Sequence, residues 1–561
     1  MSEGDKATLD GAAATTGPCI SEPATGSVFP AAWTRPRFFY GDATGAHKIT
    51  LSSAQTRHEL TIYAASLPYV LPLDIWEGLS KSVYNQDITY VVKATSGAEA
   101  TGTFQIAPVA AGGSMVFWGS PGTVPGETTN SLYGFGVGDE GVIEAIQPGE
   151  IKGTSVVANR QLRDERTTTP GHSTCVGCHS STPDGKAIAS VDHWPWNVRL
   201  YGIEAETRGA APDYLTPAGA AMIQMSWLGG TTFSKGDWDP GARRMVTTWT
   251  DRDYAGGNLY RIYDSSALSS QPLELIWIDL AAEAEAPLDL SRVDPADYMN
   301  PGDPLNQVVV NLRGTGWEVV ARTGDDDSPI LPDWSHDGSS IVYTSTDVPK
   351  DGRVGVATVS SKIDLYTVPF AAGAGGNAVP LVGASSPGFF EYYPDYAPDD
   401  SLVAFNRIPA VAAEVYYRAE SEIYVVPANG APEPVRLLAN DAVCEGTTGS
   451  LYNSWAKWAP SSATGDGKTY YFLIFSTTRS SPGPINDNGS AKYPASQLYM
   501  TTIVKNADGS ITSSPAIYLW NQRNLVAGQG DSATVSELLT NNVTPAWDEF
   551  KIPPVPPVEV R

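Results

Sequence analysis

The sequence predicts an all-β protein in which a small β-sandwich is followed by a β-propeller of about six blades. Turn-forming residues are abundant, with 54 Gly and 43 Pro among 561 residues, which suits many short strands better than long helices. Short segments alternate apolar and polar residues, and one strand–turn–strand pattern recurs through the later part of the chain. A chain of this length exceeds one ordinary hydrophobic core, so two or more domains are expected.

The first part of the chain divides into two segments. Residues 1–24 are small and polar, and we expect a disordered leader there. Residues 25–110 contain the segments KITLSS, HELTIYAA, ITYVVKAT and GTFQIAPV, whose alternation is typical of half-buried strands. Trp76 is well placed to fill a core between them. This segment resembles a β-sandwich of the fibronectin type III or immunoglobulin type.

A repeat organises residues 111–561, the predicted propeller. Each copy has a short apolar strand, a polar turn with Asp and Gly, and a second β-rich strand. In such turns Asp bonds to its own backbone and Gly takes a positive φ. A third strand follows most copies, which gives about four strands per unit, as in a propeller blade. The five copies begin at Ser181, Asp237, Asp333, Asp395 and Trp458.

A sixth blade is expected from the two ends of this region. The segments GSMVFW (Gly113–Trp118) and LYGFGVG would supply its outer strands, and NVTPAW (Asn542–Trp547) its inner strand. Closing the ring in this way removes exposed sheet edges. Six blades are therefore predicted, with seven as the alternative.

The best copy of the repeat, Asp333-Trp334-Ser335-His336-Asp337-Gly338, resembles the repeat of the TolB-like β-propeller family, x-W-S-P-D-G-x-x-I-A-Y. His336 stands where the family has Pro, and the other copies are degenerate. The resemblance covers about Gly113 to Phe550. It implies the propeller fold and a protein-binding surface of the kind TolB-like domains use.

A haem attachment motif lies just before the first repeat. Cys175-Val176-Gly177-Cys178-His179 is C-x-x-C-H. Two thiols at this spacing can each add to one vinyl group of a haem, and the following imidazole then points at the iron. We therefore expect one covalent haem c bound through Cys175 and Cys178, with His179 as the proximal iron ligand.

Two other chemistries were weighed for this motif. A zinc site needs four ligands, and no second pair of Cys or His follows at finger spacing. A redox dithiol favours a βαβ context, which the segment lacks. The pairing of C-x-x-C-H with TolB-like repeats also resembles exported bacterial proteins that carry both.

Alignment on the blade turn places the motif close to the propeller axis. His179 takes the place of Pro332 in the Asp333 repeat, which lies on the innermost strand of a blade. His193 is the first candidate for the sixth iron ligand, because a regular hairpin would bring it opposite residue 174. Met225 and Met222 are the alternatives. A His or Met ligand gives a closed electron-transfer site, and an open position favours ligand binding or peroxidase chemistry.

Charge and hydropathy restrict the partners. The net charge of −26 repels phosphate backbones and anionic lipid headgroups, so nucleic acid and membrane surfaces are not expected partners. No apolar run is long enough to span a bilayer. A basic redox partner protein would suit the acidic surface. The first residues lack the features of a signal peptide. Because haem c is attached after export, we expect the periplasm or cell surface of a Gram-negative bacterium, with the signal absent from this chain.

Two further features were considered as binding or cross-linking sites. Cys19 and Cys444 remain outside the haem motif, and in an exported protein they could form one disulfide; two unrelated thiols are the alternative. The acidic clusters Asp325–Asp327 and Asp399–Asp400 could hold Ca²⁺, with solvated turn carboxylates as the alternative.

The expected function is that of a monohaem c-type cytochrome that uses the propeller as a scaffold for electron transfer. One alternative is a haem-dependent oxidoreductase or peroxidase with its substrate in the propeller funnel. The other is a TolB-like protein-binding scaffold of the cell envelope. No Gly-x-Ser-x-Gly or His-Glu-x-x-His motif is present, so the sequence leaves open whether the protein is an enzyme.

Overall fold

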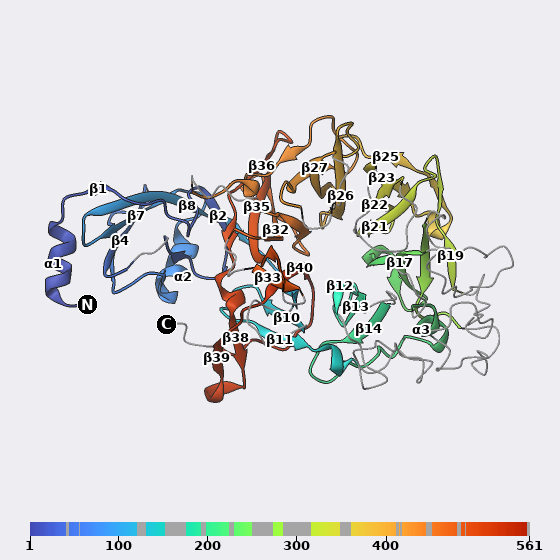
Figure 1. Cartoon of the computed structure of the whole chain (residues 1–561), viewed down its shortest axis with the longest axis horizontal. Helices are drawn as coiled ribbons and strands as arrows, with labels where there is room; N and C mark the ends of the chain where they lie inside the picture. Colours follow the sequence, from blue (N-terminus) through green and yellow to red (C-terminus); the bar gives the residue numbers. More distant parts are fainter. Residues whose placement is uncertain are drawn as a thin grey trace.

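The chain folds into an N-terminal sheet domain and a ring of β-sheets beside it (Figure 1). The computed structural model describes residues 1–40, 44–54, 56–120, 131–151, 176–191, 198–223, 229–249, 273–283, 316–347, 361–410, 415, 418–444, 451–479, 484–487 and 490–557. Strand β8 (Ala98–Ala110) ends the first part, and β9 (Ser114–Ser120) begins the second.

Residues 1–24 are ordered, which corrects the expectation of a disordered leader. Helix α1 (Glu3–Gly11) begins with a capping box, in which Ser2 and Asp5 exchange hydrogen bonds between side chain and backbone. The Asp10 carboxylate accepts hydrogen bonds from Lys48 and Tyr63, which attach the helix to the sheet. The short strand β1 (Thr15–Thr16) then pairs with β8. A capping box supplies partners for backbone groups that a helix end leaves open, so small polar residues can form a stable helix here.

The N-terminal domain has one large sheet, and its second layer is mainly helical. The sheet order is β1-β8-β7-β4-β5, with β2 also paired to β8. The second layer contains helix α2 (Leu73–Ser82) and a two-stranded ribbon. Trp76 fills the core, as predicted, but it does so from α2, where it packs edge-on against Phe29. The new strands are β2 (Ser27–Ala31), β3 (Arg37–Phe38), β4 (His47–Ser53), β5 (Leu60–Ala64), β6 (Tyr69–Val70) and β7 (Ile88–Ala94).

This arrangement differs from the expected fibronectin-like sandwich, because the segment LDIWEGL forms a helix where a second full sheet was expected. The large sheet still alternates as predicted: β4 and β7 bury every second residue over most of their length. The sequence pattern therefore identified the strands, but a period of two gives no information on what covers them.

The second part contains six sheets, each with its first-listed strand nearest the axis. Blade 1 comprises β12 (Gly177–Ser181), β13 (Ala187–Val191) and β14 (Val198–Gly202). Blade 2 comprises β15 (Gly229–Thr232), β17 (Ala242–Trp249), β18 (Glu274–Asp279) and β19 (Trp317–Val319), with β16 (Trp238–Asp239) paired to β17. Blade 3 comprises β21 (Ser328–Trp334), β22 (Ser340–Thr346), β23 (Ile363–Pro369) and β25 (Val379–Pro380).

The remaining three blades follow the same plan. Blade 4 comprises β26 (Phe389–Tyr396), β27 (Leu402–Pro409), β28 (Glu422–Pro427) and β29 (Val435–Arg436). Blade 5 comprises β30 (Ser454–Trp458), β32 (Lys468–Thr477), β35 (Gln497–Lys505) and β36 (Ile511–Ser513), with β31 (Ala463–Gly465) and β37 (Ile517–Tyr518) at its margins. Blade 6 comprises β40 (Asn541–Asp548), β9, β10 (Ser131–Gly136) and β11 (Ile143–Ile146).

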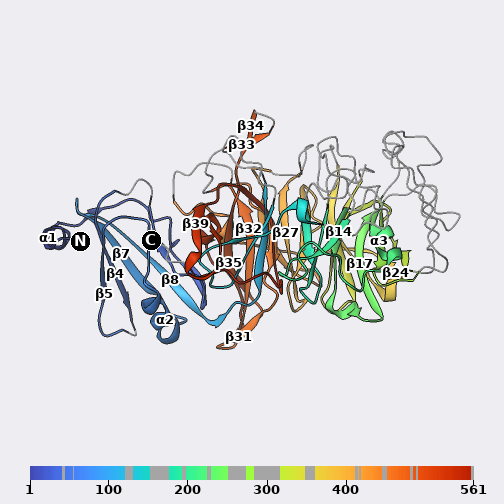
Figure 2. The same ribbon diagram turned by 90° about the horizontal axis from the view of Figure 1, so that it is seen from below.

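Short elements decorate this ring. Helix α3 (Pro217–Ile223) lies between blades 1 and 2 in the sequence. Three two-stranded ribbons complete the described elements, and Figure 2 shows one of them, β33–β34, projecting from the propeller. Their strands are β20 (Ala321–Thr323), β24 (Gly375–Asn377), β33 (Pro484–Asp487), β34 (Ser490–Pro494), β38 (Asn524–Ala527) and β39 (Thr534–Glu537).

The six inner strands form a closed ring. Each contacts the inner strand of the next blade, in the order β12, β15, β21, β26, β30, β40 and back to β12. Among the described residues this confirms the prediction of a propeller with six blades. Blade 6 is closed as predicted, because β40 from the end of the chain pairs antiparallel with β9, which begins the propeller.

The N-terminal domain is fixed to the propeller by packing, hydrogen bonds and a covalent link. Trp33 packs against Trp547 of β40, with 5.5 Å between ring centroids. The Thr502 hydroxyl of blade 5 donates to the Val28 carbonyl. Cys19 and Cys444, the pair left over in the sequence, form a disulfide that joins the N-terminal segment to the chain after blade 4.

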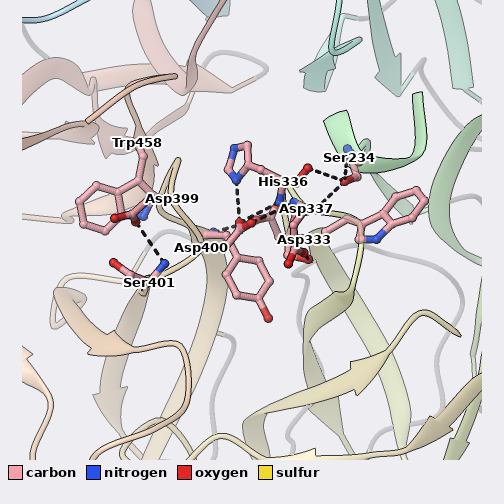
Figure 3. A network of polar contacts seen from close by, with 12 residues as sticks. Ser234, Asp333, His336, Asp337, Asp399, Asp400, Ser401 and Trp458 are labelled. Atoms are coloured by element: carbon pink, nitrogen blue, oxygen red, sulfur yellow. Dashed lines mark hydrogen bonds and ion pairs between the residues drawn. The ribbon is translucent and has the colours of Figure 1, made fainter. Parts of the chain in front are cut away.

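The turns of neighbouring blades are linked by polar contacts (Figure 3). The Asp400 carboxylate of blade 4 accepts hydrogen bonds from the backbone N–H groups of His336 and Asp337 and lies 2.9 Å from His336 Nδ1. Ser234 of blade 2 donates to the Ser335 and His336 carbonyls. Three successive blades are thereby joined at their turns, and His336 takes part in this network rather than only facing solvent.

We expect the substitution Asp400→Asn to destabilise the propeller by about 2 kcal/mol, because an amide cannot accept hydrogen bonds on both sides and leaves a donor without a partner. Asn keeps the shape of Asp and tolerates the positive φ of 56° at this position. The measurement is the urea unfolding midpoint. Asp213→Ala, on an exposed residue, is the control. Equal midpoints for Asp400→Asn and the parent chain would show that the turns contribute nothing to blade docking.

Candidate functional site

Each inner strand carries the same backbone irregularity close to the propeller axis. The pairing register of the inner strand shifts at this point in all six blades. One residue in each irregularity has a positive φ, between 44° and 70°. Such bulges bend a strand and redirect a side chain. The six bulge residues are Cys178, Gly230, Leu331, Tyr393, Trp455 and Thr544.

These six residues converge on one cavity, here called the axial pocket. It has a volume of about 320 Å³. Its walls are mainly apolar and aromatic, with Trp118, Leu331, Tyr393 and Trp455 among them. Tyr393 and Trp455 contact each other with 5.9 Å between ring centroids. A largely apolar pocket with few polar groups is typical of a site for a cofactor or small ligand.

Cys178 of the haem motif lies at the wall of this pocket. It is the bulge residue of blade 1, its side chain is exposed to the cavity, and its thiol is free. Burial within the propeller raises the pKa of the Cys178 thiol, so the group is protonated at neutral pH. Cys175, the other predicted attachment residue, lies outside the described residues.

His179 lies beside Cys178 and is buried, with 8% of its surface exposed. It occupies the position of Pro332 in blade 3, as the repeat alignment predicts, because each directly follows its bulge residue. Its Nε2 lies 3.3 Å from the Val116 carbonyl oxygen of blade 6, and its Nδ1 has no hydrogen-bond partner among the described residues. Burial lowers the pKa of His179 to about 4, so the imidazole is neutral at pH 7.

The arrangement around His179 fits a metal-bound histidine. Such a residue is neutral, and one ring nitrogen is oriented by a backbone carbonyl while the other binds the metal. Val116 supplies a carbonyl of this kind, and the Nδ1 atom is an orphaned polar atom at a cavity wall. The described part of the motif, a free thiol and this imidazole, therefore fits covalent haem attachment.

A second, polar cavity of about 100 Å³ lies against the axial pocket. The two cavities share the wall residues His179, Ser180, Thr232, Asp333 and Lys457. Its lining also includes Asp395, Asp548 and His336. The axial pocket is apolar, whereas this polar chamber is lined by charged side chains.

One ion pair separates the two cavities. The Lys457 ammonium donates to the Asp395 carboxylate, whose other oxygen accepts the Trp458 backbone N–H. Burial raises the pKa of Asp395 to about 6. Burial alone would lower the pKa of Lys457, but the charges of Asp395 and Asp333 raise it above its ordinary value. Lys457 therefore carries a positive charge at neutral pH.

The other predicted iron ligands are placed only in part. Met222 is fully buried in the hydrophobic core around α3 and β18, and it is absent from the lining of the axial pocket. It is therefore wrong as a sixth ligand in this structure, because α3 directs it into that core. His193 and Met225 lie outside the described residues. Val191, which ends β13 just before His193, lines the axial pocket.

The acidic clusters use their oxygens on protein donors. Asp325 accepts from Arg322, Tyr343 and Ser345. Asp399 accepts from Tyr471 and the Ser401 backbone, and Asp400 belongs to the turn network. Across the described ranges, no three His, Cys, Asp or Glu side chains gather as a metal site would require. The Ca²⁺ prediction gains no support from these residues.

Several residues of the site were not identified from the sequence. Trp455 was interpreted only as blade packing, and Tyr393, Lys457 and Val116 were not singled out. The repeat offered a signal for three of them. Aligned on the bulge, PDW in blade 3 and PDY in blade 4 correspond to AKW in blade 5, so Lys457 stands where the other two blades have Asp.

Comparison with solved structures returns propellers at low similarity. TolB from Acinetobacter baumannii is 12% identical, with a TM-score of 0.36, over 82% of this chain and 79% of that one. A TolB from Agrobacterium tumefaciens is 11% identical, with a TM-score of 0.32, over 74% of this chain and 94% of that one. No protein-family model and no curated protein matches the sequence. The propeller assignment therefore depends on the sheet topology and the closed ring of inner strands.

Acidification should destabilise the haem-free protein through His179. The unfolded chain takes up a proton at the ordinary histidine pKa of 6.5, whereas the folded chain does so only at about 4. The stability of the neutral form is fully present above pH 6.5 and is lost as pH falls towards 4, by about 3 kcal/mol.

Urea unfolding of haem-free protein at pH 7.5, 6 and 5 measures this loss. His179→Gln should weaken the dependence on pH, and His58→Gln, on an exposed residue, should keep it. Parallel pH profiles for the parent chain and His179→Gln would contradict the assignment of a buried neutral imidazole.

Proposed function

We propose that the protein is a monohaem c-type cytochrome, with one haem held covalently by Cys175 and Cys178 at the axial pocket of the propeller. The observation that carries this proposal is the position of the motif. The free Cys178 thiol and the half-partnered His179 imidazole lie together at the wall of a mainly apolar cavity on the propeller axis.

The residues of the chain would have separate roles. Cys175 and Cys178 would form the thioether bonds, and His179 would be the proximal iron ligand, oriented by the Val116 carbonyl. Trp118, Tyr393 and Trp455 would pack against the macrocycle and exclude water. A bound haem c supplies reversible one-electron transfer between Fe(III) and Fe(II). The physiological donor or acceptor would be a redox partner protein, for which the net charge of −26 favours a basic surface.

Export is part of the proposal, with the periplasm or the cell surface of a Gram-negative bacterium as the place of function. The disulfide between Cys19 and Cys444 supports an oxidising compartment. Among the helices of the described chain, none is both long and apolar enough to cross a membrane.

Two other functions use the same architecture. If the iron keeps an open position, the axial pocket would admit a small substrate, which gives a haem-dependent oxidoreductase or peroxidase. The propeller fold by itself supports a protein-binding scaffold of the cell envelope, with the haem in a secondary role. The haem content and the coordination of the iron separate these three functions.

Haem attachment is tested by expression in a host competent for cytochrome c maturation. The parent chain should keep a c-type pyridine haemochrome spectrum after acid–acetone extraction, and Cys175→Ala/Cys178→Ala should lose it. Cys19→Ser/Cys444→Ser, which removes the disulfide instead, should keep the haem. A colourless parent protein from a competent host would overturn the cytochrome proposal and leave the scaffold function.

The sixth ligand is tested by three substitutions in the haem-loaded protein. His193→Ala should convert a low-spin Soret and near-infrared spectrum to a high-spin one, because an axial ligand is lost. Met222→Leu should leave the spectrum unchanged, since Met222 belongs to the core. If Met225→Leu gives the high-spin spectrum instead, Met225 is the ligand. A high-spin spectrum in the parent chain would favour the peroxidase alternative.

A further inference from the structure

Three charged side chains occupy equivalent positions around the propeller axis. The second residue after each bulge is Ser180, Thr232, Asp333, Asp395, Lys457 or Ala546, in the order of the blades. Blades 3, 4 and 5 therefore bring two carboxylates and one ammonium to the same level of the ring. Asp333, Asp395 and Lys457 are here called the axial charge cluster.

The two carboxylates of this cluster are held in fixed positions by neighbouring blades. Asp333 accepts hydrogen bonds from the Thr232 hydroxyl of blade 2, at 3.1 Å, and from the Tyr396 backbone N–H of blade 4, at 2.7 Å. Asp395 accepts the Trp458 backbone N–H of blade 5, at 2.9 Å, and pairs with Lys457. Each Asp therefore reaches to the next blade, so the negative charges cannot move away from the axis without breaking contacts between blades.

The cluster lies next to the residue proposed to bind iron. Lys457 and Asp333 line both cavities, as does His179, and Asp395 lines the polar chamber. The Lys457 charge also contributes to lowering the pKa of His179, which places the two groups within electrostatic reach. Charges inside a protein act more strongly than charges in bulk water, because the surroundings are less polarisable.

A fixed charge near a redox centre changes its affinity for an electron. Reduction of the iron from Fe(III) to Fe(II) adds one negative charge to the site. A nearby positive charge stabilises the reduced state and a nearby negative charge destabilises it, in proportion to their proximity. Lys457 and the two Asp residues therefore act in opposite directions on the same equilibrium.

We propose that the axial charge cluster sets the reduction potential of the haem, with Lys457 raising the potential against Asp333 and Asp395. The inference rests on the proposed cytochrome function. It also explains why blade 5 carries Lys where blades 3 and 4 carry Asp: a third carboxylate would bring a further negative charge to the axis and favour the oxidised haem. In this view Lys457 is a positioning residue that acts on the iron without touching it.

The test is a spectroelectrochemical redox titration of the haem-loaded full chain at pH 8, where Asp395 is ionised. One electron per haem is supplied by dithionite and removed by ferricyanide. The variants are Lys457→Met, which removes the positive charge, Lys457→Arg, which keeps it, and Asp395→Asn, which removes a negative charge. Lys362→Met is the matched control, because Lys362 also pairs with an aspartate, Asp327, but lines neither cavity.

The expected result is a lower midpoint potential for Lys457→Met and a higher one for Asp395→Asn. Lys457→Arg and Lys362→Met should stay near the parent value. Shifts of opposite sign are the decisive feature, because general loosening of the pocket would move both variants the same way. Haem content and far-ultraviolet circular dichroism, measured on each variant, identify any that fails to fold; Lys457→Arg against Asp395→Asn then still gives a comparison of charge.

The outcomes separate this inference from the function on which it rests. A haem-loaded parent chain whose potential is unchanged by Lys457→Met and Asp395→Asn would overturn the role of the cluster and leave the cytochrome function intact. A parent chain without haem would overturn both. Potentials that shift in the same direction in the two variants would also reject the electrostatic role.

Discussion

Closure of the ring by β40 and β9 is the constraint on which the rest of the structure depends. The axial pocket exists only because six inner strands surround one axis, and the ring has no other join between the beginning and the end of the propeller. The same join receives the N-terminal domain, since Trp547 of β40 packs against Trp33. It also places Val116 of β9 beside His179, so the orientation of the imidazole depends on closure.

The axial bulges convert this ring into a site. A regular strand would point alternate side chains towards its two neighbouring blades, whereas a residue with positive φ turns its side chain to the axis. Gly accepts this conformation readily, but five of the six positions carry a side chain, including the β-branched Thr544. The propeller therefore bears a cost in backbone conformation at the place where Cys178, Tyr393 and Trp455 meet. Strain of this kind tends to gather at functional sites.

The sequence predicted the features that depend on local patterns. The repeat turns, the alternation in β4 and β7, and the equivalence of His179 with Pro332 follow from spacing alone, and they led to six blades. Features that depend on tertiary contacts were less accessible. The order of residues 1–24 depends on Asp10 meeting Lys48 and Tyr63 across the fold. The direction of Met222 is set by the core around α3. The positive φ at Cys178 has no signature in its residue type, because Cys gives no preference for that conformation.

The late position of β40 in the sequence has a consequence for the order of folding. Blade 1, with the C-x-x-C-H motif, is complete long before β40 is available, so the propeller stays open while most of the chain is being made and translocated. During that interval nothing from blade 6 can bury His179 or cover the axial face of Cys178. An attachment enzyme would therefore meet the motif on an accessible, unfinished ring, and closure would enclose the group afterwards. The geometry that shields the site in the finished protein also sets a time limit for loading it.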